Sequence, residues 1–349
     1  MTPAAPMPPG VSYVMPVYNE TAYIDDAIDS VLGQRYEGEQ ELVLALGPST
    51  DGTSERVERR AAGDPRIRIV RNPEITIPVG LNRAIRAATH DVIVRVDAHT
   101  ELTGDYTATA VATLERTGAA SLGGLMVARG RSRFQRAVAR AYNSRLGLGG
   151  GAYHGSAVEG PAESAYLGIM RRPALESVGL YDERLKRAED WELNFRLRAA
   201  GHLVWLDPAL RVTYWPRDTW SKLARQFRAT GIWRGELVRR HGGRHPLRYF
   251  APPALVVVAA LSLVVLLLQV SGVLKGWASL ALGLVHLGPL AYALLLLALL
   301  VTRSSGRTLA DRAVFAVVIA TMHGSWGSGF LRGVVVGARG AVDRSRIES

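Results

Sequence analysis

The sequence predicts an α/β domain with a mostly parallel sheet and helices on both faces, followed by hydrophobic membrane helices. Two observations predict this architecture. In the first part of the chain, short apolar runs alternate with segments whose apolar residues recur at helical spacing. Beyond Phe250 the composition changes to long stretches of Leu, Val and Ala, which approach or exceed the ~20 residues that cross a hydrocarbon core.

The elements of the first half alternate between strand and helix. Each expected strand is a short apolar run bounded by polar residues, which is typical of a buried parallel strand. Candidate N-cap residues in the turn Gly47–Thr53 and a proline in the first turn at Pro78 mark two helix starts. In chain order we expect a strand at Val11–Val17, a helix around Ile24–Val31, strands at Glu41–Leu46 and Arg66–Val70, a helix at Pro78–Ala88, a strand ending at Asp97, a helix over Asp105–Leu114 and a strand near Ala119–Val127.

A Gly-rich stretch, Gly147–Gly151, precedes a second group of elements. They are a strand-like run at Ala165–Met170, a helix around Pro173–Val178 and an amphipathic helix that starts at Asp190 and stops at Gly201. Glu189 and Asp190 stand at the start of this last helix, where the helix dipole favours carboxylates. Capping alone would explain these two acids, and a catalytic role is the alternative.

Asp97-Ala98-His99 follows the apolar run Val92–Val96. In an extended segment residues i and i+2 point the same way, so Asp97 and His99 are predicted to face one ligand. Open α/β sheets bind ligands just outside the carboxyl ends of their strands. A carboxylate and an imidazole placed there can hold a divalent cation on a diphosphate. A turn cap beside a surface histidine is the alternative interpretation.

Composition and missing motifs exclude several classes. The chain has no cysteine and a net charge of +11, so disulfides and thiolate metal sites are excluded. Neither a Gly-x-Gly-x-x-Gly loop after the first strand nor a Gly-Lys-Ser/Thr loop occurs, which leaves dinucleotide and P-loop enzymes unsupported. No recognised nucleic-acid motif accompanies the positive charge, so no nucleic-acid partner is expected.

Two hydrophobic stretches, Ala254–Val270 and Trp277–Val301, are expected to span the membrane. A third candidate, Asp311–Leu331, contains His323 and several glycines and serines, so it could span, re-enter or lie at the interface. The first ten residues lack the pattern of a signal peptide. Arginines flank the two spans on one side while the short link between them carries only Lys275. This asymmetry predicts a multi-pass protein of the cytoplasmic membrane with the N-terminal domain in the cytoplasm.

The segment Lys222–Arg248 carries eight Lys/Arg residues against a single acid, Glu236. A charge run is usually a solvated helix face. Because this one adjoins a membrane span, we expect it to contact anionic lipid head groups or a lipid pyrophosphate.

Four motifs together resemble a known family. They are Pro16-Val17-Tyr18-Asn19-Glu20, Ser49-Thr50-Asp51-Gly52-Thr53, Asp97-Ala98-His99-Thr100 and Glu189-Asp190-Trp191-Glu192. Their order and spacing resemble those of family 2 glycosyltransferases, inverting enzymes with the Rossmann-like GT-A fold, and above all the bacterial exopolysaccharide (succinoglycan-type) branch. The resemblance covers about residues 11–241 well and the hydrophobic tail loosely.

The resemblance implies roles for the matching residues. Pro16, Val17 and Glu20 would line the nucleotide pocket, with Glu20 near the base or ribose. Asp97 and His99 would hold Mg²⁺ or Mn²⁺, and the imidazole should favour Mn²⁺ modestly. Asp190 matches the catalytic base, next to Glu189. Arg95 and Asp51 are further candidates for donor binding, although Asp51 could instead cap the following helix. Arg171 and Arg172 are candidates for the acceptor side, or else a simple solvated pair. The other acceptor-side candidates are Trp191, Arg217, Gln226, Trp233 and Arg234.

Two departures from the family pattern affect the expected substrates. Leu46 stands where relatives usually carry an Asp that contacts the nucleobase, so a UDP-sugar, otherwise the expected donor, loses its main support. Gln226 lacks the Arg-Trp pair that follows such a Gln in the processive branch, and Trp233-Arg234 is displaced and reversed. We therefore expect one sugar to be added per encounter.

The resulting hypothesis is a membrane-anchored, metal-dependent, inverting glycosyltransferase that moves a sugar from a nucleotide diphosphate to a lipid-linked glycan. The alternatives are a polyprenyl-phosphate glycosyl synthase, a non-catalytic nucleotide-sugar-binding protein and, least supported, a glycoside hydrolase. The expected domains are a disordered N-terminus (1–10), a GT-A domain (11–235), a basic juxtamembrane segment (236–250), a membrane domain of two to three helices (251–337) and a C-terminal tail (338–349).

Overall fold

The computed structural model describes residues 7–147, 158–185, 189–241 and 247–338. Most of the expected N-terminal and C-terminal tails lies outside these ranges, as do most of the Gly147–Gly151 stretch and part of the basic segment. Contacts divide the chain into two compact units, residues 1–129 with 148–215 and residues 130–147 with 216–349. The second unit therefore takes in residues 130–147 and 216–235, which the predicted domain boundary at 235 assigns to the first.

Nine strands in the described part of the first unit form one mixed sheet, in the order β3-β2-β1-β4-β8-β6-β9-β5, with β7 paired to β9. The first four strands are parallel neighbours, as expected. The later part adds antiparallel pairings, of which β8 against β4 and β6 is the central one. The strands are β1 (Val11–Val17), β2 (Gln40–Leu46), β3 (Ile67–Arg71), β4 (Val92–Arg95), β5 (Thr100–Leu102), β6 (Ser121–Ala128), β7 (Gly160–Pro161), β8 (Ile169–Arg171) and β9 (Val204–Tyr214).

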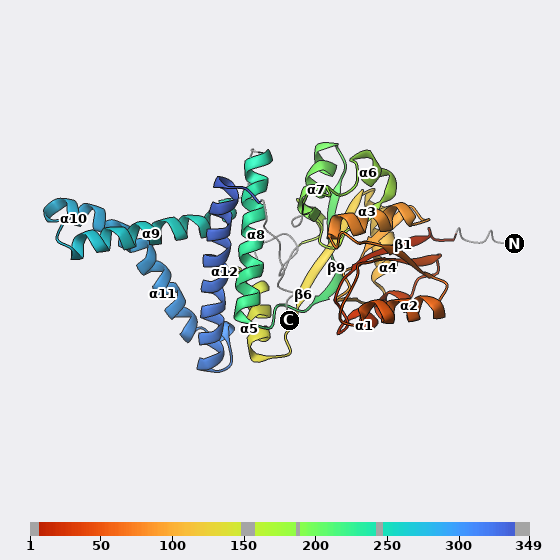
Figure 1. The fold of residues 1–349 in the computed structure, drawn as a ribbon, viewed down its shortest axis with the longest axis horizontal. Coiled ribbons are helices and arrows are strands. Elements are labelled where there is room, and N and C mark those ends of the chain that lie inside the picture. Colours follow the sequence, from red (N-terminus) through yellow and green to blue (C-terminus); the bar gives the residue numbers. More distant parts are fainter. Residues whose placement is uncertain (1–6, 148–157, 186–188, 242–246, 339–349) are drawn as a thin grey trace. The chain divides into compact units, whose positions relative to one another are not determined.

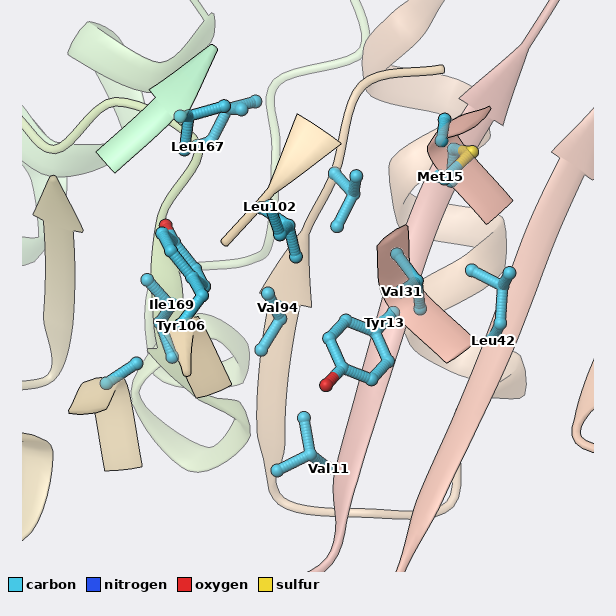
Figure 2. Close-up of a cluster of buried hydrophobic side chains, with 14 of the residues drawn as sticks. Val11, Tyr13, Met15, Val31, Leu42, Val94, Leu102, Tyr106, Leu167 and Ile169 are labelled. Atoms are coloured by element: carbon cyan, nitrogen blue, oxygen red, sulfur yellow. The ribbon is translucent and has the colours of Figure 1, made fainter. Parts of the chain in front are cut away.

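Helices cover both faces of this sheet because side chains alternate along each strand. Tyr13 and Met15 of β1 lie in one apolar cluster, shown in Figure 2, with helices α1, α2 and α4. Val14, between them, lies in a second cluster with α3, α6 and α7. The helices of this unit are α1 (Ile24–Leu32), α2 (Thr53–Gly63), α3 (Ile77–Ala87), α4 (Tyr106–Thr117), α6 (Arg172–Ser177) and α7 (Glu189–Ala199).

The loop after β1 is fixed by the turn after β2. Asn19, at φ 51°, exchanges backbone and side-chain hydrogen bonds with Ser49 and Thr50. The amides of Glu20 and Thr21 donate to Thr53 Oγ1 and Asp51 Oδ2. Two motifs thirty residues apart in the sequence thus form one rigid rim at the carboxyl end of the sheet.

The described part of the second unit is helical (Figure 1). Its α-helices are α5 (Arg133–Tyr142), α8 (Trp220–His241), α9 (Ala251–Val270), α10 (Gly276–Gly283), α11 (Leu287–Val301) and α12 (Leu309–Val335). Among the residues that the structure describes, three helical segments are long and apolar enough to cross a membrane: α9, the run Gly276–Val301 that contains α10 and α11, and α12.

Glycines bring α12 into backbone contact with α8. A Cβ added at Gly333 would lie 2.0 Å from the carbonyl oxygen of Ile232, whereas one at Gly324 of the same helix would meet nothing within 4 Å. We expect Gly333→Ala to destabilise the protein by about 1–3 kcal/mol through overpacking and Gly324→Ala to be neutral or slightly stabilising. Thermal unfolding in detergent measures both. Equal melting temperatures for the two variants would contradict the close approach.

Candidate active site

A buried arginine gathers three carboxylates at the carboxyl end of β4. Arg95, the last residue of that strand, is 3% exposed. Its guanidinium lies 3.1 Å from Asp97 Oδ1, 3.0 Å from Glu189 Oε1 and 2.5 Å from Asp190 Oδ1. Arg95 stood among the predicted donor-binding residues. The structure turns its side chain toward the acids, a placement that strand periodicity alone does not indicate, and donor binding stays a prediction.

Two elements far apart in the sequence build this cluster. β4 lies inside the sheet between β1 and β8, so a side chain at its end is buried. Glu189 and Asp190 form the first turn of α7, as predicted, where the helix dipole also favours negative charge. Arg95 therefore joins the end of one element to the start of the other.

The charges in the cluster do not balance. One guanidinium faces three carboxylates, so the group carries two net negative charges when every acid is ionised. Burial raises the pKa of Asp190 to about 7, against the pull of Arg95 and with a further rise from Glu189 and Asp97. A carboxylate whose pKa lies near neutral pH is suited to accept a proton in catalysis.

Asp190 is the most accessible of the three acids. Its side chain is 22% exposed, against 17% for Asp97 and 10% for Glu189. A substrate hydroxyl can therefore approach Asp190 more readily than Glu189, which faces Arg95 from a deeper position.

Asp97 and His99 lie in a turn, so the prediction that they share one side of an extended segment is wrong. β4 ends at Arg95, and the amide and hydroxyl of Thr100 both donate to the Asp97 carbonyl, which closes the turn. The Nδ1 of His99 lies 2.9 Å from Glu20 Oε1, and its ring meets Tyr214 edge-on. Glu20 thus contacts the imidazole, and its expected place near the base or ribose stays a prediction.

The described side chains around Asp97 and His99 do not form a closed metal site. In the ranges that the structure describes, no group of three or more His, Cys, Asp or Glu residues is arranged to hold a metal ion. Asp97 and His99 can supply two ligands at most. Mg²⁺ commonly uses one or two protein carboxylates and takes its remaining ligands from substrate phosphates and water. A carboxylate and an imidazole have the ligand chemistry for a cation that arrives with a diphosphate, but Asp97 and His99 do not form a complete site by themselves.

The carboxyl ends of β1 and β2 form the neighbouring edge. Pro16 and Val17 pair with Ala45 and Leu46, and Leu46 is buried. Asn72 is not among the predicted site residues. It directly follows β3, is 3% exposed and donates its backbone N–H to the Leu46 carbonyl oxygen. Its side-chain oxygen has no hydrogen-bond partner among the described residues. The sequence feature that could have identified Asn72 is its position as a polar residue directly after a strand that ends at this edge.

Asp51 is better described as structural than as a donor-binding residue. Its carboxylate accepts hydrogen bonds from the amide and hydroxyl of Thr53 and from the amide of Thr21. Partial burial acts to raise the pKa of Asp51, but these hydrogen bonds lower it below its usual value. These contacts hold the turn that leads into α2, whose N-cap residue is Gly52 and not Asp51 as the alternative prediction had it.

Arg171 and Arg172 do not lie at the candidate site, which corrects their assignment to the acceptor side. Arg171 pairs with Val92, at the opposite end of β4 from Arg95. Its guanidinium donates to the carbonyls of Ala119 and Leu114 and contacts Glu115. That of Arg172 donates to carbonyls of residues 85, 88 and 90. They are not a simple solvated pair either, because backbone carbonyls use their donors.

The remaining acceptor-side candidates separate between the two units. Trp191 belongs to α7 and stacks on Phe195, with ring centroids 5.5 Å apart. Arg217 and Trp233 are buried in the second unit. Gln226 accepts from the Tyr142 hydroxyl, and the Arg234 guanidinium lies 4.5 Å above the Tyr249 ring. Their acceptor-side role remains a prediction.

This fold and this acidic cluster can be compared with those of known proteins. The fold and the acidic cluster define an α/β transferase-like domain with apolar C-terminal helices. The model of the family described as Glycosyl transferase family 2 matches residues 12–179. The succinoglycan biosynthesis protein ExoA of Rhizobium meliloti (strain 1021) is 33% identical over 322 residues, covering 91% of this chain and 93% of that protein. The chain therefore belongs to glycosyltransferase family 2 and is a glycosyltransferase.

Two further relatives extend the comparison. The mannosyltransferase PcManGT from Pyrobaculum calidifontis, solved in complex with GDP-Man and Mn²⁺, has a TM-score of 0.57 and 20% identity over 95% of this chain and 88% of that one. It supports the GT-A fold. A Methanococcus voltae enzyme, dolichyl N-acetyl-alpha-D-glucosaminyl phosphate 3-beta-D-2,3-diacetamido-2,3-dideoxy-beta-D-glucuronosyltransferase, is 23% identical over 66% of this chain and 74% of its own length.

Proposed function

We propose that this protein transfers a sugar, with inversion, from a nucleotide diphosphate to a lipid-linked glycan acceptor during polysaccharide biosynthesis at the cytoplasmic membrane. The observation that carries the proposal is the Arg95 cluster, which keeps Asp190 buried enough to act as a base near neutral pH yet partly accessible. The similarity to a succinoglycan biosynthesis protein supports the pathway class.

In the proposed reaction Asp190 accepts the proton of the acceptor hydroxyl. The hydroxyl oxygen attacks the anomeric carbon as the bond from that carbon to the diphosphate oxygen breaks, so the nucleoside diphosphate leaves from the opposite face. Arg95 holds Asp190 and Asp97 in place throughout. A divalent cation, when bound, would supply Lewis-acid stabilisation of the departing diphosphate.

Asp97 and His99 are the proposed protein ligands of that cation. Glu20 would act as a positioning residue, because its contact with Nδ1 directs Nε2 of the same ring toward a ligand. Metal-bound histidines generally have such a carboxylate or carbonyl partner on the second ring nitrogen. Two net negative charges in the adjacent cluster also favour a dication.

The identity of the nucleotide depends on the edge formed by Leu46 and Asn72. A leucine cannot accept a hydrogen bond from a base N–H. The buried Asn72 oxygen lacks a partner among the described residues, and an unsatisfied buried acceptor is costly. We infer that Asn72 supports base recognition in place of the missing carboxylate. A UDP-sugar and other nucleotide donors therefore remain open.

The second candidate function is sugar transfer to polyprenyl phosphate itself. The Methanococcus voltae relative has a dolichyl phosphate sugar in its name, which makes lipid-phosphate chemistry relevant in this family. The lipid-linked glycan remains preferred because the ExoA similarity spans more of the chain. Mild acid treatment of the product separates the two, since a sugar phosphate diester is more acid-labile than a glycosidic bond.

The testing experiment uses detergent-purified full-length protein with UDP-, GDP-, dTDP- and CDP-sugars and Mn²⁺, Mg²⁺ or EDTA. We expect one donor to be hydrolysed slowly and only with metal. Glu20→Gln should weaken Mn²⁺ binding, followed by the Mn²⁺ spin-resonance signal, by about 10-fold or more. Binding of a donor without any turnover would favour the non-catalytic alternative. Full turnover in EDTA would remove the metal assignment to Asp97 and His99.

A further inference from the structure

Helix α12 differs from the other apolar segments in what surrounds it. In the most apolar 18-residue window of α9, and likewise of Gly276–Val301, 6% is buried inside the protein, against 44% for α12. Lipid is the natural solvent for the first two segments. Other helices of the same unit cover much of α12. The polarity of those helices determines whether α12 can lie in the hydrocarbon core.

Helix α8 packs closely along the C-terminal half of α12, which also contacts the first turns of α9 at Pro252 and Val256. Gly231 of α8 would place a Cβ 2.1 Å from the Trp326 carbonyl oxygen, and Gly235 would place one 2.3 Å from that of Phe330. Gly329 and Gly333 of α12 approach the Arg228 and Ile232 carbonyl oxygens as closely. Residue numbers rise together in both helices, so they run parallel and side by side, as Figure 1 also shows. Wherever this half of α12 lies, α8 lies with it.

Charged side chains make α8 unfit for the hydrocarbon core. Arg228, in its first half, is exposed, and so are Arg239 and Arg240 near its end. Glu236, 2% exposed, is paired with both of those later arginines. Charged side chains at the bilayer centre are expensive and normally face a protein or water-filled interior. If α12 crossed the membrane, α8 would have to carry these exposed arginines across with it.

The N-terminal half of α12 is also tied to polar groups. The Arg133 guanidinium of α5 lies 2.8 Å from Asp311 Oδ1. Near the middle of the helix, the His323 imidazole lies 2.7 Å from the Leu146 carbonyl oxygen through Nε2. Polar partners therefore hold α12 at its first turn and near its middle.

We propose that α12 does not cross the membrane but lies with α8 in the lipid head-group layer, where the exposed arginines contact lipid phosphates. Basic helices with an apolar side are suited to this interface. The described part of the chain then crosses the membrane twice, through α9 and through Gly276–Val301, and the segments before α9 and after α12 lie on the same side. The proposal does not depend on which sugar or acceptor the enzyme uses.

The first test uses the absence of cysteine from the chain, since each introduced thiol is unique. Ser304→Cys precedes α12, Ser349→Cys is at the last residue, and Ser271→Cys lies in the link between α9 and α10. A membrane-impermeant maleimide is applied to sealed inside-out and right-side-out vesicles. We expect the thiols at positions 304 and 349 to react in the same vesicle orientation and that at 271 in the opposite one. Reaction of 304 and 349 in opposite orientations would overturn the proposal.

The second test measures depth and separates an interfacial helix from a re-entrant one. Spin labels at Val317→Cys of α12 and Leu261→Cys of α9 form a matched pair, because both native side chains are 52% exposed. The ratio of collision rates with oxygen and with a polar nickel complex is expected to be at least 10-fold lower at 317 than at 261. Equal ratios would place α12 in the hydrocarbon core and reject the proposal, whatever the sugar-transfer assays give.

Discussion

Asp190→Asn is expected to lower the rate of sugar transfer by about 10²–10⁴-fold, the usual contribution of a general base. Asparagine keeps the shape and the hydrogen-bonding reach to Arg95 but cannot accept the acceptor proton. Donor affinity should stay within a few-fold, because the proposed donor contacts lie at Asp97 and the β1–β2 edge. Transfer rates and donor titrations on the purified variant measure the two effects separately.

The matched control for this variant is Glu192→Gln, on the same helix. Glu192 is buried and bonds Arg196 through both carboxylate oxygens, each at 2.7 Å, away from Arg95. Its loss should reduce stability and leave the transfer rate per folded molecule nearly unchanged. A fully active Asp190→Asn, or an equal loss in both variants, would remove the assignment of Asp190 as the base.

The pH dependence follows from the same residue. Because burial raises the pKa of Asp190 to about 7, transfer should fall as pH decreases through that value and the base becomes protonated. Folding stability has the opposite dependence. A carboxyl group with a raised pKa in the folded state costs no stability below its ordinary pKa, and its ionisation destabilises the fold as pH rises above that value. Asp190→Asn should therefore not destabilise the protein at pH 8.

Arg95→Met is expected to destabilise the protein by about 3–5 kcal/mol, because it leaves three carboxylates without their buried cation. Without Arg95 the pKa of Asp190 should rise further, since the guanidinium is the influence that lowers it. The loss of stability should be larger at pH 8 than at pH 5, where Asp190 is protonated. Thermal unfolding at the two pH values measures the difference.

Arg35→Met is the matched control, since it also breaks a close arginine–carboxylate pair. Arg35 bonds Asp105 at 2.7 Å through two nitrogens, but its side chain is 73% exposed. An exposed pair of this kind contributes little to stability, because water and salt screen it. If Arg95→Met cost no more than Arg35→Met, the cluster could not hold Asp190 as the mechanism requires.

Local patterns were sufficient for much of the first unit. Apolar runs gave the strands β1 to β4, and the four motifs placed Asp97 and Asp190 at one end of the sheet. Local sequence patterns did not predict contacts between side chains and partners that are distant in the sequence. The sequence predicts Arg171 and Arg172 on the acceptor side or as a solvated pair. In the structure, backbone carbonyls from two other helices and loops bind them.

The sequence by itself determined the family, the α/β domain and the apolar helices, because these depend on periodicity, length and motif spacing. Only the tertiary structure decided that Arg95 faces Glu189 and Asp190, 94 and 95 residues away, and that Glu20 reaches His99. It also showed that α12, apolar enough to span by composition, packs by its glycines on the charged α8. The physical reason is common to these cases. The environment of a side chain depends on which elements pack together, and sequence spacing does not specify that packing.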